Sequence, residues 1–82
     1  MKTSALYAIA RKVIDDGNAY GFDAWRKQDG FLRERAVKYS IAEPQLAEIC
    51  SDVERLSDRP TQDVVEQVVA RAQARGNGAR GG

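Results

Sequence analysis

The chain has 82 residues, of which 43% are hydrophobic and 30% charged, and its 13 basic and 12 acidic residues leave a formal net charge of +1. This length allows one domain, and the composition is that of a globular chain rather than a disordered one. No apolar run approaches the ~20 residues of a membrane-spanning helix, and the absence of histidine with a single cysteine excludes an internal disulfide, a Cys-His pair and a zinc site.

Small size also limits the stability of a monomer. A chain of this length leaves much of its surface exposed, and we expect a free energy of unfolding of about 5 kcal/mol. Homo-oligomerisation would add buried area, so the sequence is compatible with a monomer and with a homo-oligomer. The apolar stretch 5–10 is too short for a signal-peptide core, which together with the lone cysteine predicts a cytoplasmic protein that does not enter a membrane.

The first predicted helix covers residues 3–16, where apolar side chains recur at positions i, i+3, i+4, i+7 and i+8. Thr3 or Ser4 is expected to cap its start, because hydroxyl groups accept hydrogen bonds from the first free amides of a helix. Gly17 tolerates the left-handed turn that ends many helices, so residues 17–23 are predicted to form a loop.

A second helix is predicted for residues 24–39, with Asp23 as its cap. Gly30 lies inside this range and costs about 1 kcal/mol relative to alanine in a helix interior. Residues 24–39 therefore form either one helix or two shorter ones separated at Gly30.

Two more amphipathic helices follow. Residues 44–57 carry the cleanest apolar stripe, and Pro44 is pre-organised for a first helical position. Residues 62–75 contain two pairs of valines spaced by four residues, which favours a helix over a strand. Residues 76–82 are rich in glycine, have nothing to bury and are predicted to form a flexible tail.

These elements predict an all-α fold with a single helical domain at residues 1–75. The domain is a small four-helix bundle, or has five helices if the chain breaks at Gly30. The chemistry is limited by residue type, since no histidine can act as a base and no glycine spacing matches a phosphate-binding loop. We therefore expect a non-enzymatic protein with no catalytic residue, no metal site and no cofactor.

Charge is sorted along the chain. Residues 26–38 contain five basic and two acidic residues, whereas residues 43–66 contain seven acidic and two basic residues. Such local fields steer binding partners more than the net charge does. The acidic charges are offset by the basic stretch within one monomer, meet the basic stretch of a second subunit, or bind a foreign basic partner.

The leading hypothesis is a protein-interaction module, such as a regulator, an inhibitor or an accessory subunit, that binds a protein partner. It uses an acidic helix face and a group of aromatic anchors, since aromatic side chains carry much of the binding energy at interfaces. The acidic positions are Glu48, Asp52, Glu54 and Asp58. The aromatic positions are Tyr20, Phe22 and Trp25, which are also candidates for the core.

The alternative is a nucleic-acid-binding regulator, in which basic side chains contact phosphates and interleaved aromatic rings stack on bases. The basic positions are Arg26, Lys27, Arg33, Arg35 and Lys38.

A helix-turn-helix pattern fits part of this alternative. Ser40 stands where the turn of such a motif prefers glycine, and Pro44 would begin the recognition helix. The acidic residues of that helix would repel phosphates, which argues against this interpretation. The apolar positions with the required spacing are Ala36, Tyr39, Ile41, Leu46 and Ile49.

Overall fold

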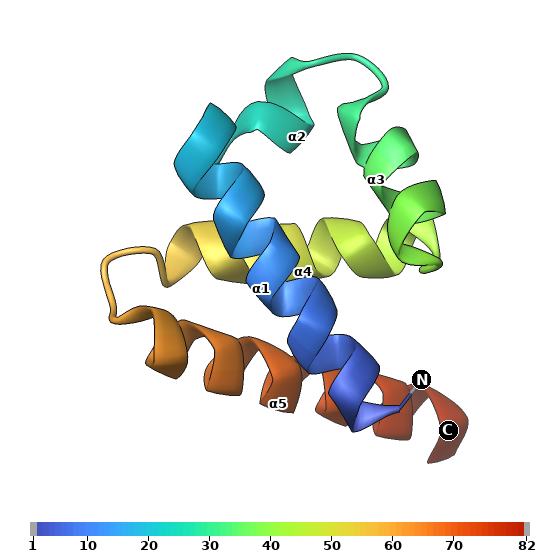
Figure 1. Ribbon diagram of the computed structural model, residues 1–82. Helices are drawn as coiled ribbons and strands as arrows, with labels where there is room; N and C mark the ends of the chain where they lie inside the picture. The colour runs from blue at the N-terminus through green and yellow to red at the C-terminus, as the bar shows by residue number, and fades with distance from the viewer. Residues whose placement is uncertain (1, 82) are drawn as a thin grey trace.

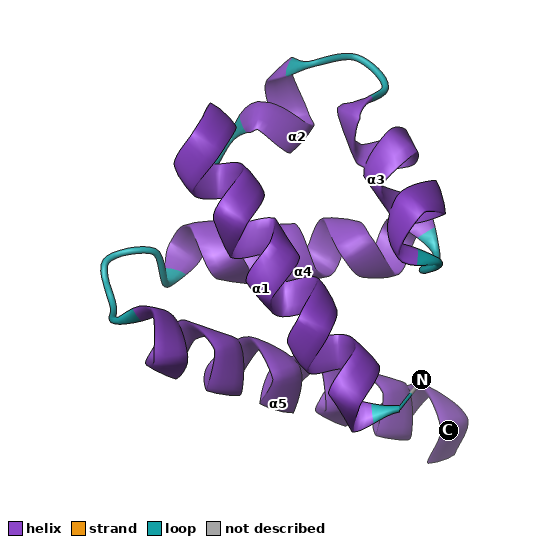
Figure 2. Cartoon of the chain, viewed as in Figure 1, coloured by secondary structure: helices purple, strands orange, loops and turns teal. Residues whose placement is uncertain are grey.

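The computed structural model describes the backbone of residues 2–81 and the side chains of residues 2–75, and the chain is almost entirely helical there. The described part contains five helices: α1 (Thr3–Tyr20), α2 (Ala24–Lys27), α3 (Phe31–Tyr39), α4 (Glu43–Arg55) and α5 (Thr61–Gly81) (Figure 1). Turns and short loops join them, and no strand occurs in residues 2–81 (Figure 2). The predicted all-α fold is confirmed.

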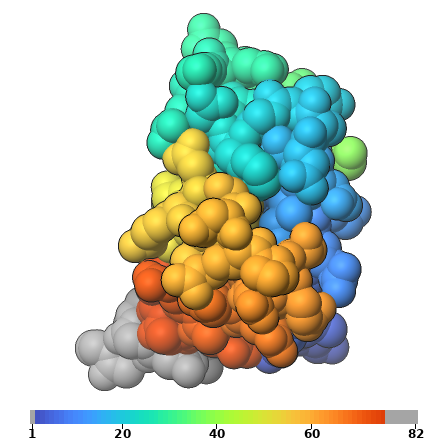
Figure 3. All heavy atoms as spheres, turned by 90° about the vertical axis from the view of Figure 1, so that its left-hand side faces the viewer, coloured from blue at the N-terminus to red at the C-terminus, as the bar shows by residue number. Residues whose placement is uncertain are grey.

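The helices cross one another. α4 and α5 lie side by side and run antiparallel, and α1 lies across both (Figure 1). α2 and α3 form the other end of the molecule, where α3 leads into α4. Seen from the side, the α4–α5 connection lies between α2 and α5 (Figure 3). The core forms where α1, α4 and α5 meet, and Leu46, Val53 and Val65 are each 0% exposed there.

α1 continues past its predicted end, through Gly17. Its N-cap is Lys2, which is extended and makes no side-chain cap hydrogen bond, so the predicted cap at Thr3 or Ser4 is wrong. The helix ends at Gly21, which has φ = 99° and donates its N–H to the carbonyl of Gly17 at 2.8 Å. The left-handed turn that ends α1 therefore lies at Gly21 and not at Gly17, where it was predicted.

Gly17 instead makes room for the ring of Phe22. A Cβ atom at position 17 would lie 2.4 Å from Cδ1 of Phe22. A glycine-to-alanine change inside a helix ordinarily stabilises it by about 1 kcal/mol. We expect Gly17→Ala to lower the free energy of unfolding instead, by about 1–2 kcal/mol, because the ring must move. Urea unfolding followed by circular dichroism measures this change.

The matched control is the same substitution in a Phe22→Ala background. The overlap is then removed, and Gly17→Ala should stabilise the chain by its helix propensity alone. A stabilising effect of Gly17→Ala in the otherwise wild-type chain would contradict this account.

The helical structure is interrupted between α2 and α3. Gly30 has φ = 78° and is the N-cap of α3, a conformation that is cheap only for glycine. Asp23 occupies the predicted N-cap position of α2 but makes no side-chain cap hydrogen bond. The five-helix alternative is therefore confirmed, and the continuous helix over residues 24–39 is wrong.

α4 agrees with its predicted position to within two residues, whereas α5 is helical through Gly81, six residues beyond the predicted end at 75, so the flexible tail predicted for residues 76–82 is not confirmed. α4 begins at Glu43 with Ala42 as its N-cap, one residue before the predicted start at Pro44. α5 begins at Thr61, and its valine-rich segment is helical as predicted. The predicted tail, residues 76–82, lies outside the part of the chain whose side chains are described. Within the described residues, none of the helices has both the length and the apolar character that crossing a bilayer requires.

Candidate functional site

Most of the predicted acidic surface takes part in ion pairs inside the chain. Glu54 accepts a hydrogen bond from Nη1 of Arg26 at 2.5 Å, and an oxygen of Glu48 lies 2.7 Å from Nε of Arg75. Asp58 is exposed, and no ion pair to it is found within residues 2–75. These contacts support the interpretation in which the acidic charges are offset within one monomer.

Asp52 is the most buried of the four acids, with 2% of its surface exposed. Arg55 donates a hydrogen bond to its Oδ1 at 2.5 Å, and Arg75 donates one to its Oδ2 at 2.9 Å. A buried carboxylate needs such partners, because an uncompensated charge in the interior costs several kcal/mol. Asp52 is therefore not presented to a partner; it ties α4 to α5.

Arg75, which the sequence did not single out as a site residue, pairs with two of the four predicted acids. It lies three residues after Ala72 and seven after Val68, so it continues the apolar stripe of α5. A cation in register with an apolar stripe is a signal for an acidic partner in the interior. The sequence alone could not identify that partner as Asp52.

The predicted basic positions do not form a single surface. Lys27 pairs with Asp23 at 2.7 Å, and their hydrogen bond lowers the pKa of that carboxyl group. Arg33 has an 80% exposed side chain and lies 3.8 Å from Glu43. Lys38 is exposed in the last turn of α3. Arg33 and Lys38 therefore remain accessible to an anionic ligand.

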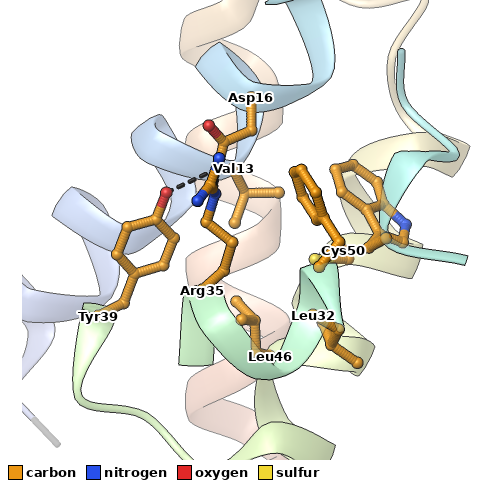
Figure 4. A pocket seen from close by; sticks show the side chains of 9 residues that line it. Val13, Asp16, Leu32, Arg35, Tyr39, Leu46 and Cys50 are labelled. Atoms are coloured by element: carbon orange, nitrogen blue, oxygen red, sulfur yellow. Dashed lines mark hydrogen bonds and ion pairs between the residues drawn. The ribbon is translucent and has the colours of Figure 1, made fainter. Parts of the chain in front are cut away.

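Arg35, in contrast, is directed into the molecule. Its Nε donates to Oδ2 of Asp16 at 3.0 Å, and the hydroxyl group of Tyr39 donates to the same oxygen at 2.6 Å (Figure 4). Burial, and after it this hydrogen bond, raises the pKa of Tyr39 above its ordinary value. The neighbouring cavity of about 10 Å³ has room for at most one water molecule. This cluster braces α3 against α1.

The aromatic positions differ in their exposure. Tyr20 is 57% exposed, and its ring meets that of Phe31 edge-on with the centroids 5.9 Å apart. Phe22 is half-buried against the core. Trp25 is 8% exposed and belongs to the core, and its Nε1 has no acceptor among the described residues. Tyr20 is therefore the aromatic side chain best placed to contact a partner.

Neither the thiol nor the acids form a reactive or metal-binding group in the described part of the chain. Cys50 is buried, and its burial raises the pKa of the thiol to about 12, so the thiol stays protonated at neutral pH. Among the described residues, no three His, Cys, Asp or Glu side chains gather as metal ligands.

A three-residue turn, residues 40–42, joins α3 to α4. Ser40 has φ = 56°, and its N–H donates to the carbonyl of Val37 at 3.2 Å. Ile41 donates to the carbonyl of Ala36 at 3.0 Å. These are the two hydrogen bonds of a Schellman motif, which ends a helix through a left-handed residue. Ser40 therefore adopts the left-handed conformation at the position where the turn of a helix-turn-helix motif prefers glycine.

The apolar positions of that pattern all face inward. Tyr39 is partly buried against the core, and the other four belong to the buried core cluster. Ile41 in the turn and Leu46 in α4 are 8% and 0% exposed. The spacing seen in the sequence thus corresponds to a packed pair of helices.

The outer face of α4 borders an open groove of about 310 Å³. Ala47 and Ser51, which line this groove, are small and one turn apart; Ala47 is half-buried and Ser51 is exposed. Cations lie along this face: Arg33 near the start of α4, Arg75 beside Glu48 and Asp52, and Arg55 at its end. The residues that line the groove are Ala47, Glu48, Ser51, Asp52, Arg55 and Arg75.

Comparison of the chain with family models, with curated proteins and with solved structures finds no match in any of the three.

Proposed function

We propose that this chain binds duplex nucleic acid, DNA in the first instance, through the α3–turn–α4 pair. The observation that carries the proposal is the turn itself: two helices joined by three residues, with a left-handed Ser40 and a buried Ile41. In helix-turn-helix proteins this arrangement holds the second helix at an angle that fits the major groove.

The outer face of α4 has side chains suited to that role. Ala47 and Ser51 are small enough to allow close approach of the helix to base edges. Gln45, the third residue of α4, is exposed. Amide and hydroxyl groups form the hydrogen bonds by which bases are distinguished in the major groove.

The charge around this face is compatible with phosphate binding. Two of the acidic residues that would repel phosphates from this helix are not free to do so: Asp52 is buried, and Glu54 pairs with Arg26. Glu43 and Glu48 remain on the helix, and each has an arginine within ion-pair distance. Lys and Arg side chains that flank a reading helix supply most of the affinity for duplex DNA.

The test is fluorescence anisotropy with labelled duplexes across a salt series. Arg33→Gln with Lys38→Gln should weaken binding about tenfold near 50 mM salt and reduce the salt slope by about two, because two phosphate contacts are lost. The matched control removes two exposed arginines elsewhere, Arg59→Gln with Arg71→Gln, and should leave the affinity within about twofold. Absence of binding to any duplex at low salt, or equal losses in the two variants, would refute the proposal.

A protein-interaction module is the second candidate, and Tyr20 favours it. The ring is 57% exposed yet held in place by Phe31 and by the guanidinium of Arg35, whose Cζ lies 5.9 Å from the Tyr20 centroid. A large, rigid, exposed aromatic side chain is typical of an interface anchor. Such a module would act as a regulator, an inhibitor or an accessory subunit. A cytoplasmic location and homo-oligomerisation stay predictions.

Affinity capture from nuclease-treated host extract tests this candidate. A protein partner should be recovered with the wild-type chain and lost with Tyr20→Ala, while Tyr7→Ala, on an exposed part of α1, serves as the control. Equal recovery with both variants would exclude Tyr20 as the anchor.

A further inference from the structure

Arg75 connects α5 to the outer face of α4. Its Nε lies 2.7 Å from an oxygen of Glu48, and its Nη1 donates to Oδ2 of Asp52 at 2.9 Å. One guanidinium thus contacts two carboxylates that are one helical turn apart on α4. Of these, Asp52 is buried, whereas the side chain of Glu48 is 57% exposed beside the groove.

Charges of the groove residues cancel only because Arg75 is present. Glu48 and Asp52 contribute two negative charges, and Arg55 and Arg75 contribute two positive ones. Without Arg75 the groove would carry one net negative charge on the face that the proposed function presents to DNA. Repulsion between that charge and phosphates would oppose binding.

We propose that Arg75 is a positioning residue for nucleic-acid binding, which neutralises Glu48 and fixes it on α4 rather than contacting the phosphates itself. This inference rests on the proposed function and adds a role for α5, a helix outside the helix-turn-helix pair. The fixed geometry follows from the fork of the guanidinium, which binds two acceptors at once.

The experiment compares the affinity for duplex DNA of four chains: wild type, Arg75→Gln, Glu48→Gln, and the double variant. We expect Arg75→Gln to weaken binding about fivefold or more, and the double variant, whose groove is again neutral, to return to within about twofold of wild type. Arg75→Lys keeps the charge and should stay within about threefold of wild type. Arg71→Gln, one turn earlier on α5, is the control for loss of an exposed arginine.

Two results would overturn the inference. Affinity that is unchanged in Arg75→Gln would show that the residue does not act on the binding face. A double variant as weak as Arg75→Gln alone would show a direct phosphate contact instead of neutralisation, and its salt slope would then be lower by about one.

Failure of the proposed function is distinguishable from failure of this inference. If the wild-type chain binds no duplex, the proposed function fails, and the role of Arg75 is decided by an unfolding cycle in urea. Arg75→Gln and Glu48→Gln should then show non-additive changes in the free energy of unfolding, as residues in one ion pair do. Additive changes would overturn the pairing on which the inference depends.

Discussion

Replacement of Leu46 by alanine is expected to lower the free energy of unfolding by about 3–4 kcal/mol, which is most of what a chain of this size possesses. Leu46 is 0% exposed and stands in the first turns of α4, directly after the connection from α3. It also lines the small cavity next to Tyr39 and Cys50 (Figure 4). The lost contacts and the enlarged cavity therefore both contribute to the effect.

Urea unfolding followed by circular dichroism measures the loss, and Val37→Ala is the control. The side chain of Val37 is the most exposed of the large hydrophobic residues described, at 77%, so its truncation should change the free energy of unfolding by less than about 0.5 kcal/mol. A loss below about 1 kcal/mol for Leu46→Ala would mean that the start of α4 is not packed as described.

The second large effect is expected for Asp52→Asn, which should lower the free energy of unfolding by about 2–3 kcal/mol. Removal of one partner from a buried ion pair costs about 3–5 kcal/mol when the other charge stays buried. Here the side chains of Arg55 and Arg75 are 58% and 34% exposed, so both can regain water and the cost is smaller.

Asp58→Asn is the control for Asp52→Asn, because Asp58 is an exposed acid close by in the sequence. Thermal unfolding should show a change of less than about 0.5 kcal/mol for this variant. Equal effects of the two substitutions would contradict the special place of Asp52 between α4 and α5.

Local patterns predicted the helical fold well. The apolar stripe of α4 and the valine pairs of α5 identified those helices, and Gly30 marked the break between α2 and α3. The end of α1 was placed too early, because a glycine followed by asparagine is a common end signal and Gly17 was read as one. Its actual role depends on Phe22, whose position is set by tertiary packing.

The charge pairs could not be predicted from local patterns. Arg26 and Glu54 are 28 positions apart, and Arg75 and Asp52 are 23 apart, so their contacts depend on how α2 and α5 pack on α4. The sorted charges of the sequence predicted an open acidic surface as one of three interpretations. The fold places arginines from three different segments beside those acids instead.

The single carboxylate that holds α3 to α1 has a consequence for local motion. α3 buries only two of its own side chains, Phe31 and Ala36, and its two side-chain donors to α1, from Arg35 and Tyr39, converge on one oxygen of Asp16. Loss of that oxygen would release both donors together. Amide hydrogen exchange should therefore show α3 opening as a unit, at a lower free energy than the α1–α4–α5 core. The turn at residues 40–42 should change its orientation together with α3.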